Sequence, residues 1–324
     1  MPAIASLSVI LPAPGGLASI ATTLEHLQAQ TARKRLELVV VTDAPQLDYD
    51  DVEHLANTFA SHRIVRLPKL SSRAVANAAG YRHAGCDVVA FAEDHCFPDP
   101  TWAEALLARH REPWAAVGPA IENANPASAV SWCDLLLNYG AWITPAAAPA
   151  LQLPGHNTSY KRAVLLEYGD QLDSMMQAET VLHWVLRSKG HRLFLESTAN
   201  VAHVNFSLWS SWLPVQLHSG RLFAATRALG KPLSWRILFT LGAPLIPVVR
   251  MVRIWGNLSS QELQRRFLSS FHALAIGLLV DGVGQMIDYA FGVGNAAEKV
   301  AQYETDRFRH IRKEERSQII GADS

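Results

Sequence analysis

The stretch AFAEDHCFPDP, residues 90–100, places three potential ligands directly after a buried strand. The apolar run at residues 88–92 has the character of a core strand, and it ends at Glu93, Asp94 and His95. In α/β sheets the carboxyl ends of strands support ligand sites. Carboxylates with an imidazole are donors for a divalent cation such as Mg²⁺ or Mn²⁺. The stretch therefore predicts either a cation site that holds a phosphate or a polar loop after a core strand.

The sequence around this stretch alternates short apolar runs with segments of helical spacing. Strands are predicted at residues 7–11, 36–41, 64–67, 88–92, 117–121, 192–195 and 199–204. Helices are predicted at residues 18–30, 52–61, 72–84, 102–109, 128–142 and 178–188, with a Pro/Ala loop at 146–150. This alternation predicts parallel strands joined by crossovers, and hence a Rossmann-like, three-layer α/β domain.

The composition is that of a chain with a sizeable core, 49% hydrophobic and 18% charged over 324 residues. The formal net charge is zero, so no nucleic-acid partner is indicated. The charge is unevenly spread. Residues 1–204 carry 15 Lys and Arg against 20 Asp and Glu, whereas residues 205–324 carry 14 against 9. A basic and apolar second part favours contact with an anionic membrane surface.

Three uncharged segments follow residue 205, at residues 207–217, 237–249 and 267–280. None reaches the roughly 20 uninterrupted apolar residues of a simple spanning helix. Their Trp content and Arg flanks favour interfacial or re-entrant helices, and the alternative is a helical subdomain packed on the sheet. We therefore divide the chain into an α/β domain, residues 1–205, and an α-helical, membrane-associating region, residues 206–324.

The three cysteines are Cys86, Cys96 and Cys133. An odd count without paired spacing argues against a disulfide framework and against a structural zinc site, and favours a reducing, cytosolic setting. The first residues, MPAIASLSVILPAPGG, have no basic segment and run into the first predicted strand, so no signal peptide is predicted.

Five segments, in order, resemble a membrane-associated bacterial family-2 glycosyltransferase with the GT-A fold. They are SVILPA, VVVTDAP, SSRAVANAAGYRHAGCDVVAFAEDHCFPDPTW, LPGHNTSYKRAVL and AETVLHWVLRSKGHRLFLESTANVAH. The resemblance implies inverting transfer of a sugar from a nucleotide-sugar donor with a divalent cation, Mn²⁺ or Mg²⁺. The implied acceptor is a hydroxyl of a lipid-linked or cell-envelope glycan at the cytoplasmic face of the cell membrane.

The resemblance also implies a role for each matching residue. Glu179 is the expected general base. The expected metal ligands are Asp94, His95 and His203. The expected donor-binding residues are Asp43, Arg73, Asn77, Glu93, Asp94, Gly155, His156 and Asn157. Each has a plainer structural alternative, as a turn residue, a residue of a solvated helix face or a capped strand end.

Two parts of the pattern depart from the family. The usual first and last Asp of the metal motif are Glu93 and His95 here, and Mg²⁺ prefers oxygen to imidazole, so the metal identity stays open. Glu179 replaces the usual Asp, and Ala178 precedes it where the family often has an acid. A degenerate, non-catalytic protein that binds a sugar nucleotide or a partner is therefore the main alternative. A nucleotidyltransferase is disfavoured because the loop LPAPGGLAS has no basic residue for a phosphate.

Overall fold

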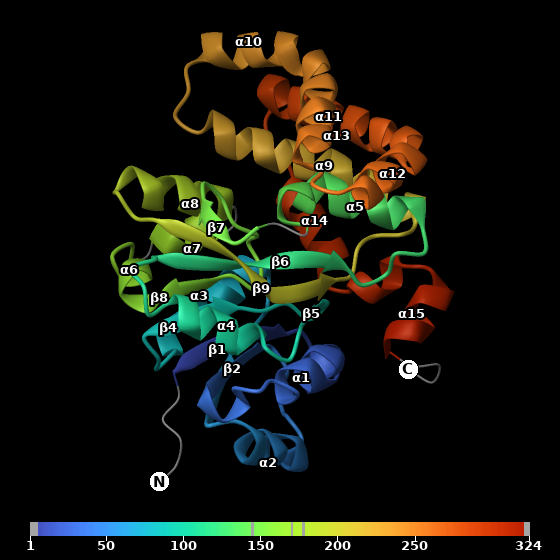
Figure 1. The fold of residues 1–324 in the computed structure, drawn as a ribbon. Coiled ribbons are helices and arrows are strands. Elements are labelled where there is room, and N and C mark those ends of the chain that lie inside the picture. Colours follow the sequence, from blue (N-terminus) through green and yellow to red (C-terminus); the bar gives the residue numbers. More distant parts are fainter. Residues whose placement is uncertain (1–5, 144–145, 170, 177–178, 321–324) are drawn as a thin grey trace. The chain divides into compact units, whose positions relative to one another are not determined.

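The computed structural model describes residues 6–143, 146–169, 171–176 and 179–320 (Figure 1). The chain forms two compact units. The sheet unit comprises Met1–Glu122 and Thr144–His203, and the helical unit comprises Asn123–Ile143 and Val204–Ser324. The helical unit thus includes a helix from the middle of the chain. The functional boundary predicted near residue 205 stays a prediction.

The sheet unit contains a mixed sheet in the order β3-β2-β1-β4-β8-β6-β9-β5, with β7 paired to β9. The first four strands of this order pair in parallel. Strand β8 is antiparallel to β4 and β6, and β5 and β7 are antiparallel to β9. The strands are β1 (Leu7–Ala13), β2 (Leu36–Thr42), β3 (Ser61–Arg66), β4 (Val88–Phe91), β5 (Cys96–Pro98), β6 (Ala116–Asn123), β7 (Ala148–Ala150), β8 (Ser159–Lys161) and β9 (Leu193–His203).

The predicted parallel strands are present from β3 to β4, whereas the pairings of β5, β7 and β8 are antiparallel. The antiparallel part contains three strands of three residues each, β5, β7 and β8, which are too short to give a periodic signal. Strand β7 lies in the segment predicted as a loop. The two strands predicted at 192–195 and 199–204 are one strand, β9. It continues through polar residues because Arg109 pairs with Glu196 at 2.8 Å, Nη2 to Oε2.

The helices of the sheet unit pack against fully buried strands (Figure 1). Helix α3 contacts β1 and β2, and a Cβ at Gly80 would overlap the side chain of Ile10, so a glycine permits this close approach. Ser72 caps α3 by accepting a hydrogen bond from the backbone N of Val75 at 3.3 Å. These helices are α1 (Ala21–Gln28), α2 (Tyr49–Thr58), α3 (Arg73–His83), α4 (Trp102–Arg109), α6 (Arg162–Leu166), α7 (Gln171–Met175) and α8 (Glu179–Ser188).

The helical unit is organised around α13, which packs against α5, α9, α10 and α11. A Cβ at Gly220 or Gly284 would overlap the backbone of the facing helix, so these glycines allow α9 and α13 to meet closely. Asp134 is buried on α5 and accepts hydrogen bonds from Trp212 Nε1 and the backbone N of Phe206, both at 3.0 Å. The helices are α5 (Ala129–Tyr139), α9 (Trp209–Ala228), α10 (Leu233–Gly242), α11 (Ile246–Asn257), α12 (Gln261–Ser269), α13 (Phe271–Phe291), α14 (Ala296–Glu304) and α15 (Lys313–Ile320).

Two helical stretches in the described part of the chain are long and apolar enough to cross a membrane. They are Leu233–Asn257, 25 residues, and Phe271–Phe291, 21 residues. The uncharged runs at residues 237–249 and 267–280 remain shorter than a simple spanning helix, as predicted, and the two stretches qualify by length and overall composition alone. The first stretch is longer than expected because Pro244 and Pro247 sit in the first turns of η4 (Ala243–Leu245) and α11, where no backbone donor is needed. Half of the apolar window of the second stretch is buried, as expected of a core helix, against 11% for the first.

Candidate functional site

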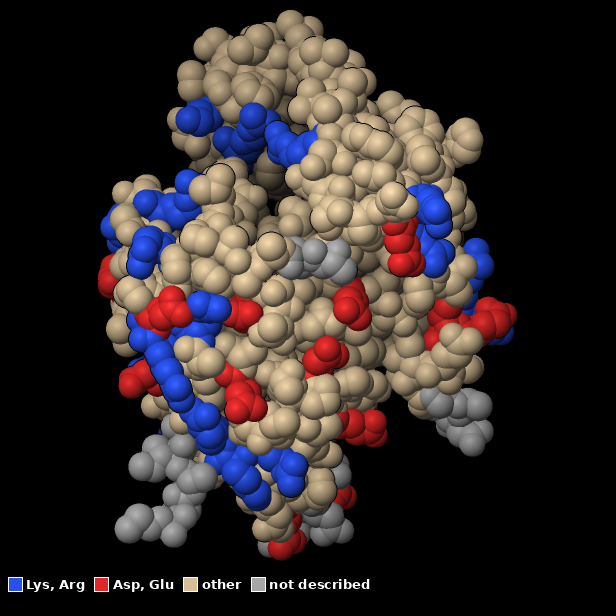
Figure 2. Space-filling model, in the orientation of Figure 1, with Lys and Arg blue, Asp and Glu red and all other residues tan. Residues whose placement is uncertain are grey.

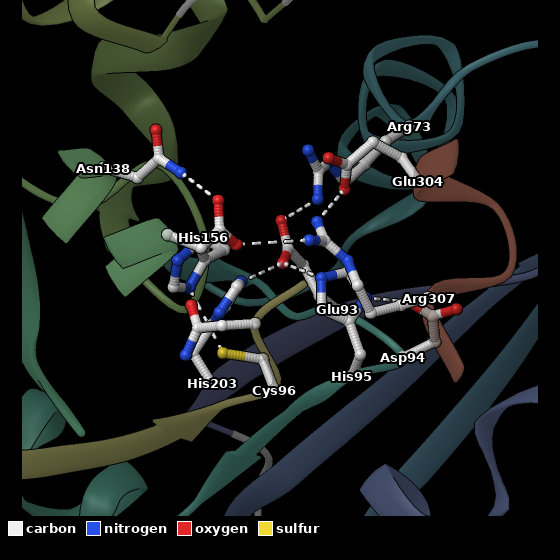
Figure 3. Close-up of polar contacts among 12 residues, drawn as sticks. Arg73, Glu93, Asp94, His95, Cys96, Asn138, His156, His203, Glu304 and Arg307 are labelled. Atoms are coloured by element: carbon white, nitrogen blue, oxygen red, sulfur yellow. Dashed lines mark hydrogen bonds and ion pairs between the residues drawn. The ribbon is translucent and has the colours of Figure 1, made fainter. Parts of the chain in front are cut away.

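Three buried side chains meet where β4 and β9 end (Figure 3). Glu93 Oε2 lies 3.2 Å from His95 Nε2 and 3.9 Å from His203 Nε2. The two imidazole rings meet edge to face, with 5.1 Å between centroids. Each of the three side chains is at most 4% exposed. The candidate ligand atoms of Glu93, His95 and His203 lie within 4.8 Å of one another, and we call these residues the carboxylate–imidazole set.

The hydrogen bonds of His95 fix how its ring is presented. Its Nδ1 lies 2.6 Å from Asp94 Oδ1, and a carboxylate only accepts, so Nδ1 carries the proton. The lone pair of Nε2 then faces Glu93, and Nε2 has no hydrogen bond among the described residues. Thr23 Oγ1 donates to the backbone oxygens of Glu93, at 3.0 Å, and Asp94, at 2.8 Å, which holds the loop in place. A carboxylate behind a metal-binding imidazole is the usual way that such a ring is oriented.

This donor set fits a divalent cation. With Nε2 unprotonated, its lone pair and the Glu93 oxygen 3.2 Å away face the same space, which a divalent cation would fill. Three protein donors also leave coordination positions for substrate oxygens and water. The sequence predicted Asp94, His95 and His203 as ligands. In the structure Glu93 supplies the carboxylate of the cluster and Asp94 braces His95.

Two further predicted residues lie at the start of α3 or bond the segment before it. Arg73, the first residue of α3, forms an ion pair with Glu93 Oε1. Asp43, which follows β2, accepts hydrogen bonds from the backbone N of Leu70 at 3.1 Å and of Gly15 at 2.9 Å. These backbone hydrogen bonds, with that from Gly15 the larger cause, lower the pKa of Asp43, so it is an anion at neutral pH.

The loop before β8 brings three more predicted residues to the cluster. The His156 ring stacks on His203 with 4.8 Å between centroids, and its Nδ1 lies 3.3 Å from Cys96 Sγ. Asn157 has a left-handed backbone, with φ of 51°, and its N donates to the oxygen of Phe91 at 2.6 Å. Its side-chain amide is fully buried, with no hydrogen bond to either end among the described residues. A buried amide in this state is a natural contact for a ligand hydroxyl.

Glu179 reaches the same loop from the first position of α8. A Cβ built on Gly155 would lie 2.6 Å from Glu179 Cδ and 2.7 Å from its Oε2. The carboxylate therefore packs directly against the glycine backbone, next to His156. Ala178, the neighbour of Glu179, lies outside the described residues.

A buried pair that the sequence did not single out holds α8 against this loop. His183, one turn after Glu179, accepts a hydrogen bond from the backbone N of Leu153 at Nδ1, at 3.4 Å. Its Nε2 lies 2.9 Å from the hydroxyl of Tyr160 on β8. Burial lowers the pKa of His183 to about 4, so the ring is neutral at pH 7. Its spacing of four residues from Glu179 was the available signal, because both side chains then lie on one helix face.

The structure thus brings most of the predicted residues near one another, some by direct contact and some through neighbours in the chain. Asp43, Arg73 and the carboxylate–imidazole set are joined on one side, and the 153–158 loop and Glu179 on the other. Asn77 lies one turn after Arg73 on α3 and is 3% exposed, and its Oδ1 has no hydrogen bond among the described residues. Sequence reasoning missed Thr23 and Cys96 as neighbours of the cluster, because their contacts span 60 residues or more.

The chain is similar to known proteins both in sequence and in structure. Residues 8–139 match the family model described as Glycosyl transferase family 2. Among solved structures, S. aureus TarS 1–349 aligns at 14% identity over 92% of this chain and 90% of its own, with a TM-score of 0.46. The same protein in complex with UDP aligns at 14% identity over 89% and 92%, with a TM-score of 0.43.

GalNAc-T7 with UDP, GalNAc and Mn²⁺ aligns at 14% identity over 62% of this chain, with a TM-score of 0.48. The alignment covers 44% of that protein's chain, so the present chain spans less than half of it. No curated protein matches the sequence.

Proposed function

Because residues 8–139 match the family model Glycosyl transferase family 2, we propose that this chain moves a sugar, with inversion, from a nucleotide-sugar to a hydroxyl of a lipid-linked or cell-envelope glycan. The family match supports the expected enzyme class. The observation that carries the proposal is the run of contacts from Glu179, through Gly155 and His156, to the carboxylate–imidazole set.

The donor diphosphate lies, in this proposal, at the carboxylate–imidazole set. His95, His203 and Glu93 hold a divalent cation, for which Mn²⁺ suits two imidazoles better than Mg²⁺ does. When bound, the cation supplies positive charge to the departing diphosphate. Arg73 adds a fixed guanidinium beside Glu93, and Asp43 accepts hydrogen bonds from the nucleoside. Such electrostatic stabilisation is commonly the largest contribution to catalysis at a site of this kind.

Glu179 acts as the general base. Its carboxylate accepts the proton of the acceptor hydroxyl while the hydroxyl oxygen attacks the anomeric carbon. The bond from that carbon to the diphosphate oxygen breaks, and the electron pair leaves with the diphosphate. Attack from the face opposite the leaving group inverts the anomeric centre. Gly155, His156 and Asn157 line the space between base and cation, where Asn157 has a buried amide for a sugar hydroxyl.

The catalytic part of the proposal is tested with Glu179→Gln, an isosteric change that removes the base. We expect transfer and nucleotide-sugar hydrolysis to fall by roughly 100-fold or more, with nucleotide and Mn²⁺ binding unchanged in calorimetry. The control is Glu167→Gln, a half-exposed carboxylate of the same unit that lies 4.0 Å from Lys189 Nζ and 3.8 Å from His191 Nε2. Full turnover by Glu179→Gln would refute the assignment, whereas binding without turnover in the wild type would favour a non-catalytic sugar-nucleotide binder.

A lipid-linked acceptor is proposed because of the surface of the helical unit. Nine large apolar side chains between residues 233 and 255 are each at least 43% exposed. They are Leu233, Ile237, Leu238, Leu241, Leu245, Val248, Val249, Val252 and Trp255, and we call them the apolar face. An apolar surface of this kind on a monomer marks a contact with a membrane or a partner.

The charges around the apolar face favour an anionic membrane. Residues 197–261 contain no Asp or Glu but six basic residues, Arg221, Arg227, Lys231, Arg236, Arg250 and Arg253. Figure 2 shows Lys and Arg, and no Asp or Glu, on the visible side of this end of the helical unit. Interfacial helices bury their apolar side chains in the membrane and place basic residues beside them, next to anionic headgroups. We therefore place the protein at the cytoplasmic face of the cell membrane.

Membrane contact is tested by flotation with vesicles that contain phosphatidylglycerol, against vesicles of phosphatidylcholine alone. Leu241→Glu with Val248→Glu should reduce binding to the anionic vesicles by about 100-fold, since each buried aliphatic side chain contributes about 1.5 kcal/mol or more. Leu166→Glu, which changes an exposed leucine of the sheet unit, should leave binding unchanged. Equal flotation of all three proteins would refute the membrane assignment without bearing on Glu179.

A further inference from the structure

A second group of buried metal-binding side chains shares Glu93 with the first. Candidate ligand atoms of Glu93, Cys96 and His156 lie within 4.8 Å of one another, and Figure 3 shows the thiol and this imidazole beside His203. Cys96 is fully buried, His156 is 5% exposed, and Sγ lies 3.3 Å from Nδ1. The proposed transfer reaction uses neither the thiol nor this ring nitrogen.

Three separate parts of the fold hold this group in place. Cys96 opens β5 and pairs in register with His203 of β9. His156 belongs to the loop that Asn157 ties to β4 through its 2.6 Å hydrogen bond to Phe91. Glu93 follows β4 and is fixed through its backbone by Thr23. The donors are therefore positioned by paired strands, as a metal site requires, and they differ from the first set by having sulfur.

The geometry points to a second, thiol-containing metal site at Glu93, Cys96 and His156 that takes Zn²⁺ and competes with the cation of the carboxylate–imidazole set. Sulfur, nitrogen and oxygen donors together suit zinc, whereas Mn²⁺ and Mg²⁺ gain little from a thiolate. On binding, the Cys96 thiol releases its proton to solvent and a sulfur–metal bond forms.

We expect the two sets to compete for one ion, because Glu93 is the carboxylate of both and neither set has a second acid to offset the charge of a second ion. Two divalent ions a few ångströms apart repel strongly in a buried site, and the only acid common to both sets is Glu93. A zinc ion at Cys96 and His156 therefore withdraws Glu93 from the first set. If the proposed function holds, zinc inhibits transfer at this site. The binding claim itself does not depend on that function.

Cobalt is the direct probe, because Co²⁺ bound by a thiolate gives a charge-transfer absorption band in the near ultraviolet. Protein stripped with a chelator is titrated with Co²⁺, and we expect the band to saturate at one ion per chain. Cys96→Ser should abolish the band. Cys133→Ser and Cys86→Ser make the same change at two other buried thiols and should retain it. Thermal unfolding of each variant shows that it is folded.

Competition with a chromophoric chelator then measures affinity for Zn²⁺. Cys96→Ser and His156→Gln should each weaken Zn²⁺ binding by about 10-fold or more, whereas Mn²⁺ binding by Cys96→Ser should change less than about twofold. His95→Gln should weaken Mn²⁺ binding and retain the cobalt band. The inference is overturned if wild-type protein gives no band, if the band survives Cys96→Ser, or if Cys96→Ser and His156→Gln both bind Zn²⁺ as tightly as the wild type does. Loss of Mn²⁺ binding without loss of transfer in His95→Gln would instead count against the proposed function.

Discussion

Gly155→Ala tests whether the position of the Glu179 carboxylate matters. The new Cβ would lie 2.6 Å from Glu179 Cδ, whereas ordinary contact begins at 3.4 Å, so the carboxyl group has to retreat by about 0.8 Å. The clash is with the end of a flexible side chain, and the backbone of Gly155 does not have a positive φ. The fold therefore tolerates the change, and the free energy of unfolding should move by less than about 1 kcal/mol.

Catalysis does not tolerate a displaced base to the same degree. A misplacement of about 1 Å costs on the order of 100-fold in rate, so kcat should fall roughly 10- to 100-fold, or about 1.4 to 2.7 kcal/mol in activation free energy. Steady-state transfer measures kcat, and calorimetry with Mn²⁺ and the nucleotide should give unchanged affinities. Gly256→Ala is the matched control, because no atom lies within 4 Å of the added methyl group.

A second substitution separates displacement of the base from a general disturbance of the loop. Glu179→Asp shortens the side chain by one methylene group and should itself reduce kcat. Combined with Gly155→Ala it removes the two nearest atoms, Cδ and Oε2, and places the carboxyl carbon at the Cγ position, 3.0 Å from the added methyl group, where rotation about χ2 turns its oxygens aside. The double variant should therefore lose less than the two single losses combined. Full kcat in Gly155→Ala, or strictly additive losses in the double variant, would refute the reasoning.

Three further predictions concern pH, packing and the buried amide. Burial lowers the pKa of His110 and His183 to about 4, so the free energy of unfolding decreases as the pH falls from 6.5 towards 4. Unfolding in urea should show a loss of about 2 kcal/mol for each histidine between pH 7.5 and 5. His183→Gln should halve the total loss, and an unchanged dependence on pH would contradict this. Gly284→Ala places a methyl group against the backbone of Leu217 and should cost about 1–3 kcal/mol in thermal unfolding, whereas Gly242→Ala, with open space around it, should not. Asn157→Gly keeps the left-handed backbone but removes the amide, so kcat/KM for the donor should fall by about 10-fold with stability retained; an unchanged kcat/KM would remove Asn157 from the sugar site.

The sequence predicted β1, β2 and β4 well because each of these strands is a fully buried, mainly aliphatic run. Leu36–Thr42 is buried at every position and was predicted to within one residue. Strands β5, β7 and β8 were missed because three residues carry no periodicity and are stabilised by pairing with distant segments. Strand β9 was divided in two because the ion pair that carries it past Glu196 depends on Arg109, 87 residues earlier.

The site residues show the same division between local and distant information. Glu93 and His95 are recognisable because they follow a strong strand, and Glu179 because it begins an amphipathic helix. The partner of the thiol is not recognisable, because Cys96 and His156 are 60 positions apart and meet only when β5 pairs with β9 and β8 joins β4. Zinc motifs are recognised by the spacing of ligands along the chain. The absence of such a spacing argues against a structural zinc motif but does not test for a site assembled from several strands.

The two departures in the metal motif compensate each other. Glu93 ion-pairs with Arg73 through one oxygen and faces His95 and His203 with the other, which the longer arm of a glutamate allows. His95 provides a nitrogen where the family has a carboxylate, and Asp94, bonded to Nδ1 at 2.6 Å, fixes its tautomer. The motif thus keeps its two carboxylates, but Asp94 orients the imidazole of His95 instead of facing Glu93 directly. In the proposed function, a site changed in this way would favour a transition metal over Mg²⁺, and the sulfur of Cys96 and the imidazole of His156 lie close to the same Glu93.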